Sequence, residues 1–173
     1  MAAEYRIDLP SRVTVEAMVH HSSSVEETQR LGRILGEVAK AGDSIALIGD
    51  LGAGKTHLIQ AIATGLGVPS DVRVTSPTFT LVNIYRGGRM TLVHADLYRL
   101  EREAELVELG LDDWIGDEAL VCVEWADRFA ALPNDALEVR MDVSDATSRR
   151  IEISALGPLS MALYARFEEA LSS

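Results

Sequence analysis

Cysteine is almost absent from this sequence. The 173 residues include one cysteine, Cys122, so the chain cannot form a disulfide bond within itself. Because Cys122 lies in the apolar run 120–123, we expect a buried thiol rather than a reactive one. Long apolar runs are also missing: none reaches the roughly 18 residues of a membrane span, and Met1 to Arg12 has no signal-peptide segment. A cytoplasmic location without a membrane partner is therefore expected.

Positive charge is scarce as well. The chain has 16 lysines and arginines against 27 aspartates and glutamates, which gives a formal net charge of −11. An acidic surface repels the phosphate backbone of nucleic acids. Any role in nucleic-acid metabolism is therefore expected to run through a nucleotide or a partner protein.

Neither a linker nor a low-complexity tail is evident. The 13 glycines and five prolines are scattered along the chain, and 47% of the residues are hydrophobic. This length and composition suit one compact domain with a well-buried core. We expect a single domain over residues 1–173.

Helical and strand patterns alternate along the first part of the chain. Ser24 and Glu27 form a capping-box pattern before a helix that Gly42 ends. The apolar run Ser44–Ile48 predicts a strand buried on both faces, and a glycine-rich loop and a second helical pattern follow it at once.

The rest of the chain predicts more strands and three short helical segments. A Gly-Gly pair at 87–88 separates two strand patterns and indicates a hairpin. Together the elements predict a three-layer α/β fold with a mixed, partly antiparallel sheet. Further strands are expected at Arg12–Val19 (an edge), Phe79–Tyr85, Met90–Asp96, Ala119–Val123, 137–143 and 151–153, and helices at Glu101–Asp117 (broken at Gly110) and Met161–Leu171.

The glycine-rich loop, Gly49 to Thr56, fits the phosphate-loop pattern G-x-x-x-x-G-K-[ST]. Glycines let several backbone N–H groups point at a phosphate, and the helix that follows adds a positive dipole end. Lys55 is suited to span the β- and γ-phosphates, and the Thr56 hydroxyl to ligate Mg²⁺. We expect Asp50 to point away from the nucleotide.

Two carboxylates end strand patterns and are candidates to complete the site. Glu124 follows the buried run 119–123, so a strand parallel to Ser44–Ile48 would bring it to the phosphate loop as a magnesium ligand. Asp96 ends another strand and is a candidate to hold or deprotonate water. A pair with Arg99, or a cap of the next turn, is the alternative for Asp96.

Three neighbouring features have an ordinary structural reading and a functional one. His94 is expected to be packed and hydrogen-bonded rather than catalytic. Trp125 is expected in the core, with a gate beside the pocket as the alternative. The hydroxyl groups of residues 75–78 would sense the γ-phosphate; alternatively, these residues form an ordinary loop held by local side-chain hydrogen bonds.

ATP is favoured over GTP. No Asn-Lys-x-Asp guanine signature occurs, and the D-x-x-G match at 113–116 follows a helical pattern, so it is attributed to chance. One rival function is a non-enzymatic binding module gated by a nucleotide. The other is a small nucleotide or metabolite kinase, which needs an arginine-bearing lid. The segment Glu101–Glu118 has eight acids and one arginine, the reverse of such a lid. This acidic segment is either a solvated face or a docking site for a basic partner.

Taken together, these motifs resemble the TsaE (YjeE) family, and their order and spacing match it over roughly Ser22 to Ser154. The resemblance implies a P-loop ATPase that acts with TsaB and TsaD in placing threonylcarbamoyl on the adenosine beside the anticodon of tRNA. ATP hydrolysis would support turnover of the assembly, and tRNA would be contacted only through that complex. The matching motifs are the phosphate loop, S-P-T-F-T-L-V at 76–82, H-A-D-L-Y-R-L at 94–100, E-L at 105–106, E-L-G at 108–110 and V-E-W at 123–125.

The resemblance also implies roles for single residues. Lys55 would hold phosphate, Thr56 and Glu124 would bind Mg²⁺, and Asp96 would assist hydrolysis; we treat Lys55, Asp96 and Glu124 as the catalytic set. Arg149 falls near a family nucleotide contact, although Arg150 adjoins it. The implied contacts with ATP are Ser24 (or Val25, at the adenine), Asp50, Leu51, Gly52, Ala53, Gly54, Lys55, Thr56, His57 and Arg149.

The departures from the family pattern are few. His57 stands where a second threonine is common, and its side chain is expected just outside the phosphate cradle. Asn83-Ile84-Tyr85 replaces a more usual Glu-Pro-Tyr, which removes any expectation of a charge at position 83.

Overall fold

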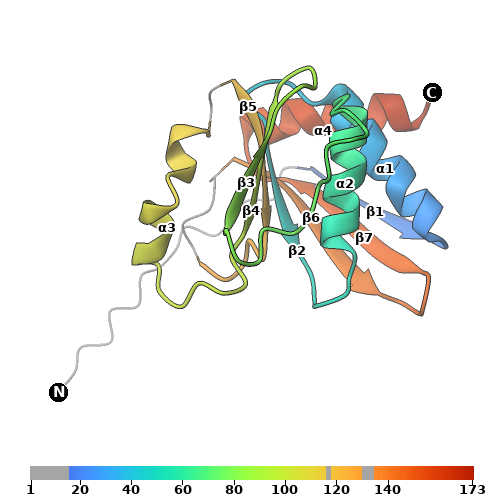
Figure 1. Ribbon diagram of the computed structural model, residues 1–173. Helices are drawn as coiled ribbons and strands as arrows, with labels where there is room; N and C mark the ends of the chain where they lie inside the picture. Colours follow the sequence, from blue (N-terminus) through green and yellow to red (C-terminus); the bar gives the residue numbers. More distant parts are fainter. Residues whose placement is uncertain (1–15, 116–117, 130–134) are drawn as a thin grey trace.

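The computed structural model describes residues 16–115, 118–129 and 135–173. Within these residues seven strands form one sheet in the order β1-β7-β6-β2-β5-β4-β3 (Figure 1). The strands are β1 (Glu16–Ser22), β2 (Ser44–Ile48), β3 (Val82–Tyr85), β4 (Thr91–Asp96), β5 (Ala119–Glu124), β6 (Leu137–Val143) and β7 (Arg149–Ala155). The helices are α1 (Val25–Val38), α2 (Lys55–Gly65), α3 (Ala104–Glu108), the 3₁₀ turn η1 (Leu111–Asp113) and α4 (Pro158–Leu171).

The sheet is mixed, as the sequence predicts. Strand β2 is parallel to β5 and β6, and β4 is parallel to β5. Strands β3 and β4 form the expected antiparallel hairpin, and so do β6 and β7. Strand β1 pairs antiparallel with β7 at one edge. The parallel strands therefore end at one common edge of the sheet.

Helices cover both faces of the sheet, which gives three layers. In Figure 1, α1 and α2 lie on one side of the sheet and α3 lies on the other; α4 packs on α1, β6 and β7. Strand β2 is buried along its whole length, because alternate side chains enter different cores. Ile45 and Leu47 join the cluster beneath α1, α2 and α4, whereas Ala46 and Ile48 join the cluster on the α3 side.

Helices α1 and α2 cross at very short range. A Cβ atom built on Gly36 would lie 2.1 Å from the carbonyl oxygen of Ile62, and one on Gly65 would lie 2.1 Å from that of Arg33. No side chain fits at such distances, so glycine at both positions lets the two backbones touch. The crossing therefore packs α1 tightly against α2, whose first residue is Lys55.

The start of α1 differs slightly from the expected capping box. The Ser24 hydroxyl accepts a hydrogen bond from the Glu27 N–H at 3.2 Å, as predicted. The Glu27 carboxylate, however, accepts from the Ser23 N–H at 2.6 Å rather than from that of Ser24. The preceding edge strand runs from Glu16 to Ser22, later than the expected Arg12–Val19, of which residues 12–15 lie outside the described part.

The strand expected at Phe79–Tyr85 begins only at Val82. Residues 77–81 form a turn instead, closed by a 2.7 Å hydrogen bond from the Leu81 N–H to the Pro77 carbonyl. Leu81 has a positive φ of 64°, which no strand accommodates. The apolar residues of this segment misled the prediction, and Phe79 is 83% exposed.

The structure bears on two expectations that came from residue types and runs that the sequence lacks. Cys122 is fully buried in β5, as expected. In the residues that the structure describes, no helix combines the length and apolarity needed to cross a bilayer. The cytoplasmic location remains a prediction. The D-x-x-G match at 113–116 includes Gly116, which lies outside the described residues.

Candidate nucleotide-binding site

A pocket of about 350 Å³ lies where the parallel strands end. Strand β2 leads into the phosphate loop here, and β5 and β4 end beside it, because all three run in one direction. In open α/β sheets this edge is where ligands bind. The lining residues are Leu51, Gly52, Gly54, Lys55, Thr56, His57, Ser76, Thr78, Asp96, Tyr98, Glu124 and Trp125.

The phosphate loop has the backbone that its glycines predict. Gly54 has φ 106° and directly precedes α2, so the chain enters the helix through a conformation that favours glycine. A Cβ on Gly49 would lie 2.4 Å from the Met141 carbonyl oxygen, which shows how closely the loop passes β6. The first N–H groups of a helix have no partner within it, and the first residues of α2, Lys55 and Thr56, line the pocket, so an anion is favoured there.

Lys55 lies buried at the first turn of α2. Its ammonium group donates to the carbonyl oxygens of Gly49 at 2.6 Å and Asp50 at 2.9 Å, and lies 4.1 Å from the centre of the Trp125 ring. Burial lowers the pKa of Lys55 below the usual lysine value, and the carboxylates of Glu124 and Asp96 oppose that shift. The positive charge is thus held at the loop by weak neutral acceptors, which a phosphate could replace.

Glu124 and Thr56 meet at the bottom of the pocket. The Thr56 hydroxyl donates to Oε1 of Glu124 at 2.8 Å, across 68 residues of sequence. Nε2 of His94 also lies 2.8 Å from Oε1. The predicted magnesium pair is therefore brought together, and His94 is buried and hydrogen-bonded as expected.

Asp96 ends β4, lines the pocket and links this strand to the segment before β3. Its Oδ2 accepts from the Ser76 hydroxyl at 2.9 Å, and its Oδ1 accepts from the Tyr98 N–H at 2.9 Å. The cap of the next turn, one alternative for this carboxylate, is thus present. Arg99, the other alternative partner, stacks on Phe79 instead, with its guanidinium carbon 4.4 Å from the ring centre. The Ser76–Asp96 contact links the expected switch segment to the pocket.

Arg149 is the arginine that reaches the phosphate loop. Its Nε donates to the Ala53 carbonyl at 2.8 Å, and its Nη2 lies 3.4 Å from the Gly52 carbonyl. Arg150 points elsewhere and pairs with Glu152 at 2.8 Å and Asp142 at 3.5 Å. The geometry thus separates two arginines that the sequence left equivalent.

Comparison with known proteins identifies a family for this chain. A family model described as "Threonylcarbamoyl adenosine biosynthesis protein TsaE" matches residues 22–151. The chain belongs to the TsaE family. TsaE proteins are P-loop proteins, and membership implies that this chain binds a nucleotide.

Curated TsaE relatives cover most of the chain. The protein named tRNA threonylcarbamoyladenosine biosynthesis protein TsaE from Nostoc sp. is 44% identical over 133 residues, 75% of this chain and 80% of the relative. The Bacillus subtilis protein of the same name is 38% identical, over 76% of this chain and 82% of the relative. A solved structure described as "Crystal structure of Bacillus subtilus YdiB" has a TM-score of 0.76 at 30% identity, covering 89% of this chain and 95% of that one. The predicted family and fold are confirmed.

Not every residue expected to contact ATP lines the TsaE pocket. Leu51, Gly52, Gly54 and His57 line it together with Lys55 and Thr56, while Ala53 is buried in the loop. Asp50 is exposed and outside the lining, consistent with a side chain that points away. The Ser24 hydroxyl caps α1 and is also outside the lining, so its contact with adenine stays a prediction.

Sequence reasoning missed one aromatic residue of this TsaE site. Tyr98 lines the pocket, and its ring centre is 4.9 Å from that of Trp125. Its place in the motif H-A-D-L-Y-R-L at 94–100 was the available signal. Trp125 is half-buried, packs against the core and also lines the pocket, so the core placement and a position beside the pocket both apply.

Proposed function

We propose that this chain binds ATP with Mg²⁺ and hydrolyses it in support of tRNA threonylcarbamoylation. It would act with TsaB-like and TsaD-like proteins on the adenosine next to the anticodon, as a single P-loop ATPase domain over residues 1–173. One observation carries the proposal: Lys55, Thr56 and Glu124 surround one pocket at the phosphate loop, with the Thr56 hydroxyl 2.8 Å from the Glu124 carboxylate. The names of the relatives support the tRNA pathway.

The phosphates of ATP would lie along the loop. Backbone N–H groups of Gly52 to Thr56 would hold the β-phosphate, and the Lys55 ammonium would leave the carbonyls of Gly49 and Asp50 to contact the γ-phosphate. Leu51 and His57 would border the phosphates, and Arg149 would keep the loop in shape or contact the nucleotide itself. Ser24 would lie toward the adenine.

The residues present fit a magnesium ion. Thr56 and Glu124 offer a hydroxyl and a carboxylate oxygen side by side, and Mg²⁺ prefers oxygen ligands with few from the protein. In the described residues no group of three or more His, Cys, Asp or Glu could hold a metal. A nucleotide-bound Mg²⁺ needs no such group, since phosphates and waters supply its remaining ligands. The ion would neutralise charge on the phosphates.

Hydrolysis also needs a positioned water. Asp96 is 5% exposed, lines the pocket and carries the Ser76 hydroxyl on one oxygen. It would orient a water toward the γ-phosphate, and Ser76 would report whether that phosphate is present. The buried ammonium of Lys55 would stabilise the negative charge that moves during bond cleavage.

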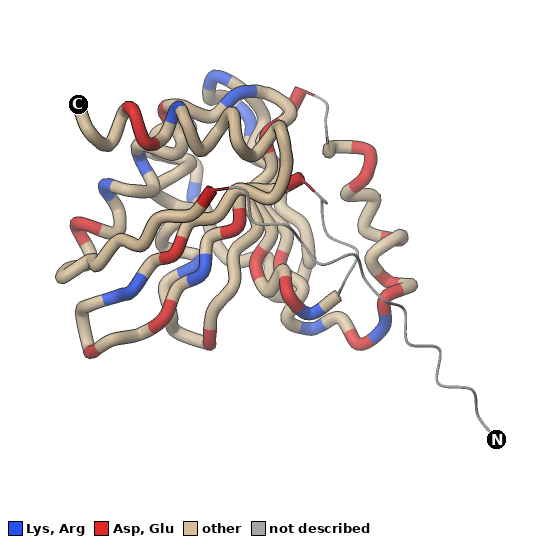
Figure 2. The backbone as a smooth tube through the Cα atoms, turned by 180° about the vertical axis from the view of Figure 1, so that it is seen from behind, with Lys and Arg blue, Asp and Glu red and all other residues tan. Residues whose placement is uncertain are grey.

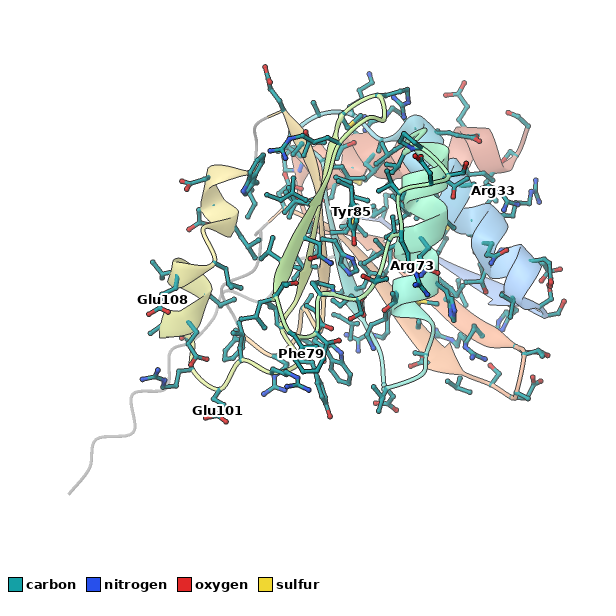
Figure 3. All side chains as sticks on the ribbon, viewed as in Figure 1. Arg33, Arg73, Phe79, Tyr85, Glu101 and Glu108 are labelled. Carbon is teal, nitrogen blue, oxygen red and sulfur yellow. The ribbon has the colours of Figure 1, made fainter. Side chains whose placement is uncertain are left out.

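This chain would bind its partner proteins directly and would contact tRNA only through them. The described part of the acidic segment, 101–115 and Glu118, shows in Figure 2 as a series of Asp and Glu positions around α3. Beside it, Phe79 protrudes at the end of the sheet where β2 leads into α2 (Figure 3). A basic partner surface would complement the segment, which is unsuited to bind tRNA itself.

The decisive experiment measures ATP hydrolysis by the reconstituted assembly with Lys55→Ala. We expect a loss of turnover of at least about 100-fold, the scale found when one group that stabilises transition-state charge is removed. Lys40→Ala is the matched control, because Lys40 is exposed and is the other lysine of the chain. Unchanged hydrolysis in Lys55→Ala would refute the site. Faster phosphorylation of a nucleoside monophosphate than ATP hydrolysis would favour the kinase alternative.

A further inference from the structure

His94 lies beneath the nucleotide pocket and is not part of its lining. The side chain is 0% exposed, in the middle of β4, where its Cα pairs with those of Asn83 on β3 and Cys122 on β5. Nε2 is 2.8 Å from Oε1 of Glu124. Nδ1 has no hydrogen-bond partner, and among buried side-chain nitrogens and oxygens of the described residues it is alone in this.

The carboxylate decides which ring nitrogen carries the hydrogen. An ionised carboxylate can only accept, so Nε2 must be the protonated nitrogen and must donate to Glu124. Nδ1 then keeps a buried lone pair without a donor, which costs free energy of folding. A leucine of similar size would fill this place in the core without that cost. Packing alone therefore does not explain a histidine at this position. The hydrogen bond that it donates to Glu124 does explain it.

Both hydrogen bonds to Glu124 fall on the same oxygen. Oε1 accepts from the Thr56 hydroxyl and from His94, each at 2.8 Å. The Thr56 hydroxyl can ligate a magnesium ion through an oxygen lone pair while its O–H still donates to the carboxylate, so this group would serve two partners at once. The His94 ring is fully buried and has no hydrogen-bond partner other than Glu124, so its donor is reserved for the carboxylate.

We propose that His94 is a positioning residue for magnesium binding, acting through Glu124. Its Nε2–H holds one carboxylate oxygen, so that the carboxylate is aimed into the pocket before the ion arrives. This inference rests on the proposed function, because it assumes a magnesium–nucleotide complex at this site. Outer-shell hydrogen bonds of this kind typically change metal affinity by about 10- to 100-fold.

The test is a magnesium titration of nucleotide binding by the full-length protein. Affinity for a fluorescent ATP analogue is measured in EDTA and at rising Mg²⁺ for wild type, His94→Leu and His94→Gln. We expect His94→Leu to bind as wild type in EDTA but to need about 10-fold or more Mg²⁺ for the same gain in affinity. His94→Gln, whose amide can donate from nearly the same place, should recover most of that loss.

Two controls separate positioning from a general weakening of the sheet. Leu92→Ala removes buried volume from the same strand and the same face without touching Glu124, so it should lower stability and leave the magnesium titration unchanged. In a double-mutant cycle, His94→Leu should cause no further loss when Glu124 is already glutamine. An additive loss would show that His94 does not act through Glu124.

A measurement on the wild-type protein covers the case in which His94→Leu fails to fold. Long-range ¹⁵N–¹H NMR of the ring should show hydrogen on Nε2 and a lone pair on Nδ1, and the chain has only four histidines to assign. An Nδ1–H tautomer, or equal magnesium titrations for wild type and His94→Leu, would overturn the inference while leaving the nucleotide site intact. Absence of any magnesium-dependent binding by wild type would instead refute the proposed function.

Discussion

Replacing Arg149 by methionine should loosen the phosphate loop and weaken nucleotide binding. Methionine keeps much of the aliphatic length and removes every hydrogen bond of the guanidinium group. The wild-type group makes one short bond to the loop, at 2.8 Å to the Ala53 carbonyl, and one long bond, at 3.4 Å to that of Gly52. Two further bonds, to the carbonyls of Asp145 at 3.1 Å and Ser148 at 2.9 Å, hold the arginine itself on the β6–β7 turn.

The magnitude follows from these two bonds to the loop. A hydrogen bond from a charged donor contributes about 1.5–3 kcal/mol, and Arg149 is half-buried, so the low end applies. The bond at 3.4 Å is beyond the ordinary N–H···O range and adds little. A loss of about 1.5–2 kcal/mol corresponds to roughly 10- to 30-fold weaker binding, if the loop must be ordered before it binds.

Calorimetric titration with the magnesium complex of ATP or ADP measures this effect. Arg150→Met is the matched control, since that neighbour pairs with Glu152 and Asp142 and makes no contact with the loop. Its affinity should stay within about twofold of wild type, as expected for an exposed ion pair. Weaker binding in Arg150→Met together with wild-type binding in Arg149→Met would refute the reasoning and reverse the choice between the two arginines.

Two predictions concern the sheet and the helices behind the site. Gly36→Ala should lower the free energy of unfolding by about 1–3 kcal/mol in a urea titration, because the new Cβ would lie 2.1 Å from the Ile62 carbonyl oxygen. Helix propensity alone predicts the opposite sign, so a stabilised variant would contradict the close crossing. The control, Arg30→Ala at an exposed position of the same helix, should change the free energy of unfolding little. Burial raises the pKa of the Cys122 thiol far above its usual value, so the unreactive neutral form should persist to pH 10. Iodoacetamide should therefore label Cys122 at that pH only in denaturant. Rapid labelling of the native protein would show that the strand opens.

Much of the site could be predicted because its signals are local. The strand Ser44–Ile48, the loop and the helix from Lys55 adjoin in the sequence, and each has a pattern that one segment can carry: a short apolar run, spaced glycines, and helical spacing of Leu58, Ile59 and Ile62. Glu124 was predictable for a related reason, since a carboxylate after a buried parallel strand must lie at the ligand edge of the sheet.

Predictions were wrong or undecided where the local composition is compatible with two different structures. Residues 79–81 are as apolar and β-branched as a strand, but a turn with a positive φ at Leu81 occupies them, and the Asp96 N–H bonds to the Leu81 carbonyl at 3.0 Å. Trp125 was open to a core or a gate position, and the structure has its ring both against the core and 4.1 Å from the Lys55 ammonium. Both outcomes depend on neighbours that are far away in the sequence.

The sequence by itself determined that a phosphate-binding strand, loop and helix exist in this protein, and which carboxylates end the strands beside them. Backbone conformation and hydrophobic period are properties of adjacent residues, so they can be read without the fold. Only the tertiary structure decided that Arg149 rather than Arg150 contacts the loop, that Tyr98 meets Trp125, and that Nε2 of His94 lies 2.8 Å from Glu124. Those contacts depend on strand register and on the direction in which each side chain leaves its strand, and a shift of one residue in register would reverse them.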